Sequence, residues 1–189
     1  MKVMNKKAPK EVIDNVLRLP LQSSIKHRIP WLMIGLIGGL GAAGIVEYFE
    51  STLKDNIVLA AFIPLIVYMS DAVGTQMEAF VLRDYAINPS INFKRYFMRQ
   101  LAIIAVIGFL ASIVLFIATM IFYMRFDLSF VLSFSLFVAV ISSIFTGLII
   151  PKFLGRFRLD PANASGPIAT LLQDIMSVFI FFGVASLLL

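Results

Sequence analysis

The sequence predicts an all-α integral membrane protein with five transmembrane helices and a short N-terminal helix at the cytosolic or interfacial surface. The 189-residue chain is 60% hydrophobic and has a mean hydropathy of +0.94, which is too apolar for a soluble domain of this size. It contains five apolar runs, each close to or above the ~20 residues that cross a bilayer as a helix. Only short polar segments separate these runs, so the chain has no room for a large soluble domain.

The first 29 residues form a polar and basic segment, which we separate from a five-helix transmembrane domain at residues 30–189. Between residues 10 and 29, apolar side chains recur at helical spacing, and Pro20 interrupts the pattern. This spacing favours an amphipathic helix lying on the cytoplasmic membrane surface. The alternative is a plug-like helix that caps the inner mouth of a pore.

The first predicted span covers residues 31–49. One of its faces carries small residues, which allow another helix to approach closely: Gly35, Gly39, Ala42 and Ala43. We interpret this face as a structural packing surface.

The second span, residues 57–82, carries an acidic stripe inside an otherwise apolar run. Asp71, Thr75 and Glu78 follow the spacing i, i+4 and i+7, so they lie on one side of a helix. An ionised side chain facing lipid costs several kcal/mol, so the stripe must face a partner or a water-filled path. Pro64 removes a backbone donor and predicts a kink that frees carbonyl groups near the stripe.

The third and fourth spans are predicted at residues 101–123 and 130–150. We interpret the hydroxyl residues of the fourth span as interhelical hydrogen-bonding groups: Ser142, Ser143 and Thr146. Pro151 is expected to end this helix, because proline has no N–H to continue the hydrogen-bonding pattern.

The fifth span, residues 168–188, repeats the polar pattern of the second. Thr170, Asp174 and Ser177 again follow the spacing i, i+4 and i+7. The spans contain no buried Lys or Arg that would neutralise these carboxylates. Two helices whose acidic stripes face water therefore suggest a path for cations.

The distribution of positive charge predicts the orientation. With the N-terminus inside, all of the 16 Lys and Arg residues except Lys54 and Arg125 lie in cytoplasmic segments. We therefore predict a multi-pass protein of the cell (plasma) membrane with an extracytoplasmic C-terminus, embedded in the lipid bilayer. The same rule accounts for the net charge of +5, so we expect no nucleic acid partner.

The ligand atoms in the spans suit a hard divalent cation. Mg²⁺ prefers oxygen ligands and gives up its water reluctantly, so a suitable pore offers oxygens to a largely hydrated ion. Asp71, Thr75, Glu78 and Asp174 supply such oxygens. The chain has no Cys, and its single His lies outside the spans, which argues against a softer transition metal.

Three alternatives stay open on the residues alone. Carboxylates in a membrane also suit a proton relay, so a proton-coupled divalent cation carrier would use the same acids. A pair of membrane aspartates occurs in intramembrane aspartic proteases, but the Tyr-Asp and Gly-x-Gly-Asp motifs of that family are missing here. The third alternative is a non-transport membrane subunit whose acids pair with a partner's basic residues. We expect no enzymatic activity.

Three segments carry a family resemblance. They are Arg28-Ile29-Pro30-Trp31-Leu32; Phe62-Ile63-Pro64 followed by Gly74-Thr75-Gln76 and Arg83; and Asp160-Pro161-Ala162-Asn163-Ala164-Ser165-Gly166-Pro167 followed by Thr170 and Asp174. Together they resemble the membrane domain of the MgtE family of magnesium channels and transporters, which is related to the animal solute-carrier family 41. The similarity covers nearly all of residues 28–189.

The resemblance implies a homodimer of five-span subunits that conducts divalent cations, with Mg²⁺ favoured, through a pore between the subunits. The second and fifth helices would line this pore. Asp174 would be the central cation-binding residue, and Thr170 would contribute a backbone carbonyl that faces the ion.

Two departures from the family pattern make the expected pore more acidic. The family usually has Gly-Asn where this chain has Ser70-Asp71, and a small residue is common at the position of Glu78. Bacterial members also carry large cytosolic sensing domains. We expect this chain to lack them and to retain only the plug-like N-terminal segment.

Overall fold

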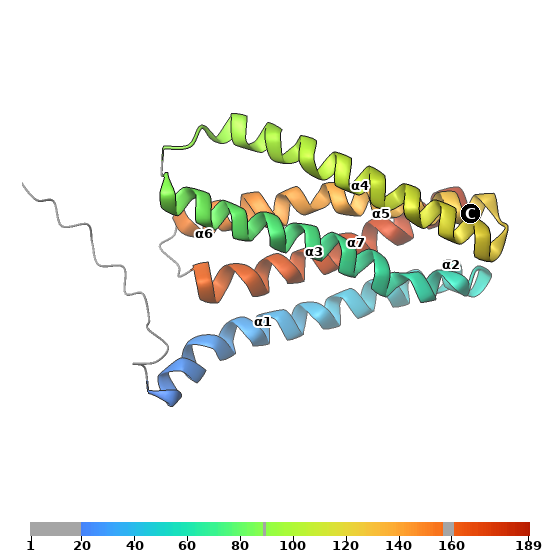
Figure 1. Ribbon diagram of the computed structural model, residues 1–189. Helices are drawn as coiled ribbons and strands as arrows, with labels where there is room; N and C mark the ends of the chain where they lie inside the picture. Colours follow the sequence, from blue (N-terminus) through green and yellow to red (C-terminus); the bar gives the residue numbers. More distant parts are fainter. Residues whose placement is uncertain (1–19, 89, 157–160) are drawn as a thin grey trace, which may run out of the picture.

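A computed structural model describes residues 20–88, 90–156 and 161–189, and all regular structure within these ranges is helical (Figure 1). Its elements, in chain order, are α1 (Leu21–Tyr48), α2 (Glu50–Asp55), α3 (Val58–Ile87), α4 (Phe93–Tyr123), α5 (Phe126–Ile144), the π-helical turn η1 (Phe145–Ile149), α6 (Ile150–Arg156) and α7 (Pro161–Leu188).

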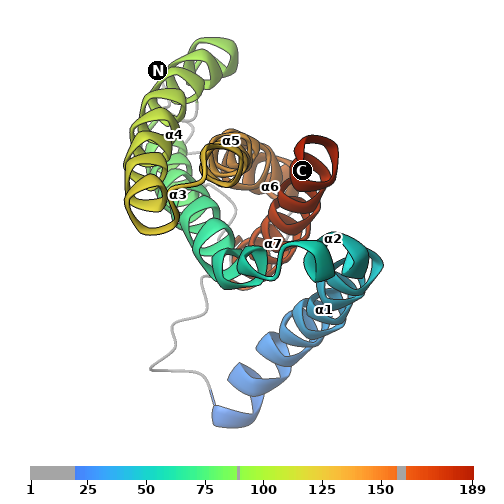
Figure 2. The same ribbon diagram turned by 90° about the vertical axis from the view of Figure 1, so that its right-hand side faces the viewer.

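Five helical segments of the described chain are long and apolar enough to cross a membrane. They are α1, α3, α4, the continuous rod of α5, η1 and α6, and the part of α7 from Gly166 onward. They run along one another as a bundle, in which α1 and α4 lie on opposite sides (Figures 1 and 2). The predicted fold class is therefore confirmed.

The first span begins earlier than predicted. Residues 21–29, the described part of the predicted N-terminal helix, continue directly into the span because α1 runs through Pro30 without ending. Residues 1–19, which hold the rest of that predicted helix, lie outside the described residues. The division of the chain at residue 29 stays a prediction.

The expectation that Pro151 ends the fourth span is wrong, because α6 contains Pro151 and continues the rod to Arg156. The turn η1 comes directly before it, and there the Ile150 N–H donates to the Phe145 carbonyl, five residues back. The wider π turn places Pro151 in the first turn of the next helix segment, where its missing N–H costs little.

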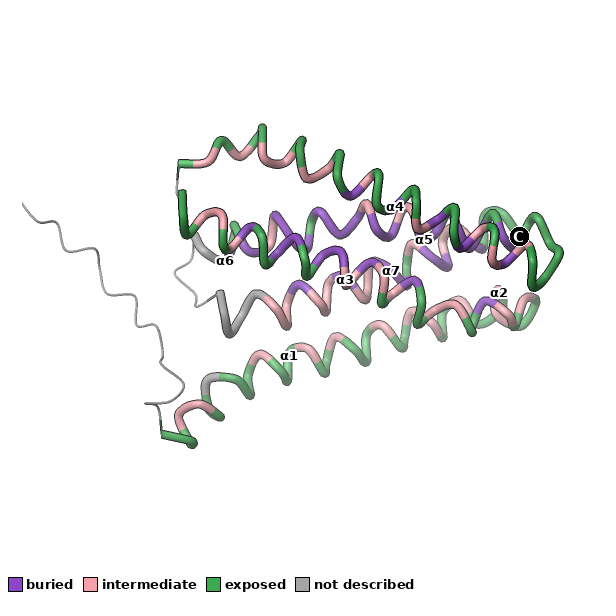
Figure 3. Tube along the Cα trace, in the orientation of Figure 1, coloured by how far each residue is buried: buried purple, intermediate pink, exposed green. Residues whose placement is uncertain are grey.

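The core lies where α3, α5 and α7 meet, and α5 is its centre. Leu128, Leu132 and Ala139 of α5 are fully buried, and buried positions dominate this helix in Figure 3. In contrast, most of α1 is exposed or half-buried. The bundle therefore consists of a packed centre with α1 attached to its edge.

The helix α1 packs on α7 through a side on which Gly35 and Gly38 are half-buried. A Cβ on Gly38 would overlap the side chain of Leu171 in α7. Gly39 and Ala43, which were predicted to lie on the packing face, are exposed. The small-residue contact exists, but it is centred one residue earlier than the sequence suggested.

The described basic residues gather at one end of the bundle. The starts of α1 and α4, the end of α3, and α6 lie at the left in Figure 1, while α2 and the C-terminus lie at the right. The left end carries Lys26, Arg28, Arg83, Lys94, Arg95, Arg99 and Lys152, and the right end carries Lys54 and Arg125. This separation is what the positive-inside rule requires of one cytoplasmic end, and the orientation itself stays a prediction.

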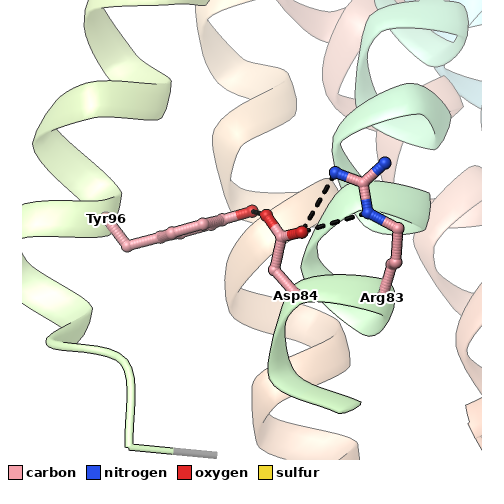
Figure 4. Close-up of polar contacts among 3 residues, drawn as sticks. All are labelled: Arg83, Asp84 and Tyr96. Carbon is pink, nitrogen blue, oxygen red and sulfur yellow. Dashed lines mark hydrogen bonds and ion pairs between the residues drawn. The ribbon is translucent and has the colours of Figure 1, made fainter. Parts of the chain in front are cut away.

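A polar contact joins α3 to α4 at this basic end (Figure 4). The Tyr96 hydroxyl of α4 donates to Asp84 Oδ2 at 2.9 Å, and Arg83 donates to Asp84 Oδ1 at 3.0 Å. The carboxylate thus ties the two helices together directly beside the loop that connects them.

The helix α3 and the turn η1 approach each other at two glycines. A Cβ on Gly147 would overlap the Gly74 carbonyl oxygen and lie 2.9 Å from Met77 Cε. A Cβ on Gly74 would lie 3.2 Å from Thr146 Oγ1. At position 147 only a residue without a side chain allows this backbone contact, whereas a Cβ at position 74 would press on the Thr146 hydroxyl.

We expect Gly147→Ala to lower the free energy of unfolding by about 1–3 kcal/mol, because the added methyl meets the backbone of α3, which cannot yield locally. Unfolding of the purified protein in detergent measures this. Gly183→Ala is the matched control, since a Cβ there has nothing within 4 Å. Equal stability of the two variants would contradict the close approach of α3 and η1.

Candidate functional site

Two aspartates meet between α3 and α7. Asp71 and Asp174 are both half-buried, and Asp71 shares a side-chain hydrogen bond with Thr170. Asp174 lies near enough to Asp71 for the two charges to interact. The structure therefore brings three of the five predicted site residues together.

The other two predicted residues lie farther along α3. Thr75 is exposed, and Glu78 is buried to 8% exposure. Seven residues of helix span about 10 Å, so Asp71 and Glu78 cannot hold one ion together. Among the described residues no group of three or more His, Asp or Glu side chains could hold a metal ion. One chain thus supplies a pair of carboxylates and not a closed metal site.

In the described part of the chain, no basic side chain forms a salt bridge with the pair. Within the described ranges neither Asp71 nor Asp174 belongs to a salt bridge. The ion pairs that do form, such as Arg83–Asp84 and Arg125–Asp127, lie near the ends of the bundle. No Lys or Arg of the described ranges therefore balances the negative charge of this pair.

A buried polar network, which sequence reasoning did not find, lies directly behind the carboxylates. Gln173 accepts a hydrogen bond at Oε1 from Thr146 Oγ1 at 2.7 Å. Its Nε2 donates to Ser177 Oγ at 3.0 Å and to Ser142 Oγ at 3.2 Å. The Ser70 and Ser177 hydroxyls are 2.6 Å apart. We call these five residues the Gln173 network: Ser70, Ser142, Thr146, Gln173 and Ser177.

The network corrects one prediction and confirms another. Ser177, which was placed on the acidic stripe, is fully buried against Ser70 and faces the protein interior. Ser142 and Thr146 hydrogen-bond across to α7, as predicted for interhelical groups. Ser143 donates only to the Val140 carbonyl of its own helix. The one available signal for Gln173 was an amide inside an apolar span, next to an aspartate.

The arrangement is chemically suited to binding a cation. Two carboxylates and a hydroxyl offer oxygen atoms, and a Mg²⁺ ion that keeps most of its water needs only one or two carboxylates. Neither Cys nor His lies among the residues of the pair or the network. The site can hold an ion loosely enough for release.

Comparison with known proteins finds one family to which this chain is similar. A family model described as MgtE, divalent cation transporter, matches residues 63–184. The chain is 37% identical over 163 residues to the magnesium transporter MgtE of Bacillus subtilis (strain 168), an alignment that covers 85% of this chain and 36% of that protein. It is 30% identical over 177 residues to the magnesium transporter MgtE of Enterococcus faecalis, covering 93% and 39%. For the Thermus thermophilus protein of the same name the identity is 27% over 165 residues, covering 86% and 36%. The chain thus spans well under half the length of these curated relatives.

We expect the Ser70–Ser177 hydrogen bond to couple α3 and α7 by about 0.5–1.7 kcal/mol, the range for such bonds between membrane helices. A double-mutant cycle with Ser70→Ala and Ser177→Ala, read by unfolding in detergent, measures this coupling. Ser186→Ala paired with Ser70→Ala is the control, because Ser186 is exposed and bonds only to Gly183 of its own helix. Fully additive losses in the first cycle would show that the two hydroxyls do not bond.

Proposed function

Because the chain belongs to the MgtE family of divalent cation transporters, we propose that it moves a divalent cation, with Mg²⁺ favoured, across the cell membrane. The observation that carries this proposal is the pair Asp71 and Asp174. Two carboxylates lie together within the predicted spans, beside Thr170, and no described Lys or Arg forms a salt bridge with them. Such a pair is expensive in lipid and is useful where a cation passes.

In this proposal Asp174 is the central binding residue and Asp71 faces it from α3. Thr170 holds the Asp71 carboxylate by a hydrogen bond and so limits its orientations. Thr75 and Glu78 lie farther along α3, toward the basic end of the bundle, where the Glu78 carboxylate adds negative charge and Thr75 adds a neutral hydroxyl. A largely hydrated ion passes the two aspartates and is bound weakly there, and the buried Glu78 acts on it through its negative field.

The pore is proposed to lie between two copies of the chain. One protomer offers only two carboxylates at the site, and the described residues form no metal-binding group of three. A homodimer that faces the α3–α7 side inward would double the number of carboxylates and shield them from lipid. The orientation proposed is N-terminus inside, with the basic end of the bundle in the cytoplasm.

The alternatives differ in what a purified protein does. A proton-coupled carrier would use the same carboxylates, but its cation flux would depend on a pH gradient. A non-transport subunit would give no flux alone. The family match is to transporters and gives no support to the protease alternative.

We expect Asp174→Ala to reduce Mg²⁺ uptake into proteoliposomes to the level of protein-free vesicles, because the central carboxylate is lost. Size-exclusion chromatography of the purified variant should show an unchanged folded dimer. Asp127→Ala is the matched control, since Asp127 is an exposed acid at the start of α5 that pairs with Arg125. Undiminished uptake by the Asp174 variant would remove it from the centre of the path.

We expect Asp71→Asn to change the preference among cations more than the total flux. The amide keeps a hydrogen-bonding partner for Thr170 but removes one negative charge from the pair, which weakens the field that the ion meets. Uptake of Mg²⁺, Ca²⁺ and Co²⁺ by wild type and variant gives the preference ratios. Identical ratios in the two proteins would contradict a role for Asp71 in selection.

A further inference from the structure

Each of the two aspartates directly follows a residue of the Gln173 network. Ser70 precedes Asp71 on α3, and Gln173 precedes Asp174 on α7. Neighbouring side chains on a helix point about 100° apart, so holding one of them fixes the direction of the next. Whatever determines the orientation of Ser70 and Gln173 therefore also determines where the carboxylates point.

The network holds both residues from several sides. Ser70 contacts Ser177 at 2.6 Å, and Ser177 in turn accepts from Gln173 Nε2 at 3.0 Å. Gln173 reaches the fourth span through Thr146 at 2.7 Å and Ser142 at 3.2 Å. One connected set of hydrogen bonds thus links α3, α7 and the α5–η1 rod.

Apolar packing alone would not fix these rotations in a membrane. Lipid tails are as apolar as leucine side chains, so turning a helix between protein and lipid changes little apolar burial. Turning α7 would instead leave the Gln173 amide, which is 1% exposed, without partners in a medium that offers none. The hydrogen bonds therefore select one rotation.

Thr146 bonds to Gln173 from within the π turn. Thr146 is the second residue of η1, and its hydroxyl lies between Gln173 Oε1 and the backbone of α3 at Gly74. A π turn adds one residue to the helical repeat, so it rotates the subsequent residues relative to a regular helix, and such turns are frequent at functional sites. A regular α-helix here would present another face to α7.

We infer that Gln173, Thr146 and Ser70 are positioning residues that hold the Asp71 and Asp174 carboxylates on one path and so set ion preference. The part of this inference that concerns ion preference rests on the proposed function. None of the three is inferred to touch the ion. Their effect on the ion runs through the direction of the neighbouring aspartates.

A matched pair of variants at one position tests this. Thr146→Val keeps the shape of the side chain but removes the hydroxyl that bonds Gln173, whereas Thr146→Ser keeps the hydroxyl. We expect Thr146→Val to shift the ratio of Mg²⁺ to Ca²⁺ flux in proteoliposomes by roughly three- to tenfold, the population shift that one interhelical hydrogen bond can produce. Thr146→Ser should keep the wild-type ratio. Gln173→Leu should shift the ratio in the same direction as Thr146→Val.

A purely structural role is tested by Leu132→Ala, which opens a cavity in the fully buried core of α5 away from the network. This variant should lower stability and the amount of protein but leave the flux ratio unchanged. A ratio shifted as strongly by Leu132→Ala as by Thr146→Val would overturn the inference. So would a wild-type ratio in Thr146→Val.

A second readout does not need transport. The chain has no native Cys, so Asp71→Cys combined with Thr170→Cys reports the approach of two side chains that are hydrogen-bonded in the structure. We expect Thr146→Val to slow disulfide formation between these positions several-fold, and Thr146→Ser and Leu132→Ala to leave its rate unchanged. Equal rates in all backgrounds would overturn the inference. Absence of flux in the wild type with a slowed rate in Thr146→Val would instead count only against the proposed function.

Discussion

The hydrogen bond between Ser70 and Ser177 is the contact on which the arrangement of the two aspartates depends. It joins α3 and α7 inside a bilayer, where an unpaired hydroxyl or amide has no water to bond. Because Gln173 bonds to Ser177 and to the fourth span, the same constraint extends through the centre of the bundle. The two carboxylates lie at the side of this network, and they have no salt-bridged basic partner among the described residues.

Close packing and polar contacts act together at this point. Gly74 and Gly147 let α3 and η1 approach until backbone meets backbone, and this approach brings Thr146 within reach of α7. Asp71 then lies beside α7 and not against the core of α5. The fold thus separates two polar layers: a hydrogen-bonded one inside, which gives rigidity, and a pair of carboxylates at its edge, which can meet an ion.

The sequence predicted the features that depend on local pattern. The five spans followed from length and hydropathy, and the neighbouring positions of Asp71 and Asp174 followed from two matching stripes with no cation to balance them.

Features that depend on a neighbouring helix were missed. Gly38 and not Gly39 meets α7, because the direction in which α1 leans cannot be read from its own residues. Gln173 points inward because its partners Thr146 and Ser142 lie on the fourth span, and no pattern in its own helix shows these partners. Pro151 continues a helix because a π turn precedes it, and nothing in the local sequence announces that turn.

Family membership and site geometry both support the proposal that this chain moves a divalent cation across the membrane. The family model covers residues 63–184, which include both aspartates and most of α3 and α7, and the geometry gives these helices a reason to carry acids. The most direct test is whether Asp174 faces water inside the membrane. In this chain without native Cys, Asp174→Cys can be treated with a charged, water-soluble methanethiosulfonate reagent, with Ile113→Cys on the exposed apolar side of α4 as the reference. We expect rapid modification at position 174 and almost none at position 113. Equal resistance at both positions would place Asp174 in a dry environment and contradict an aqueous cation path.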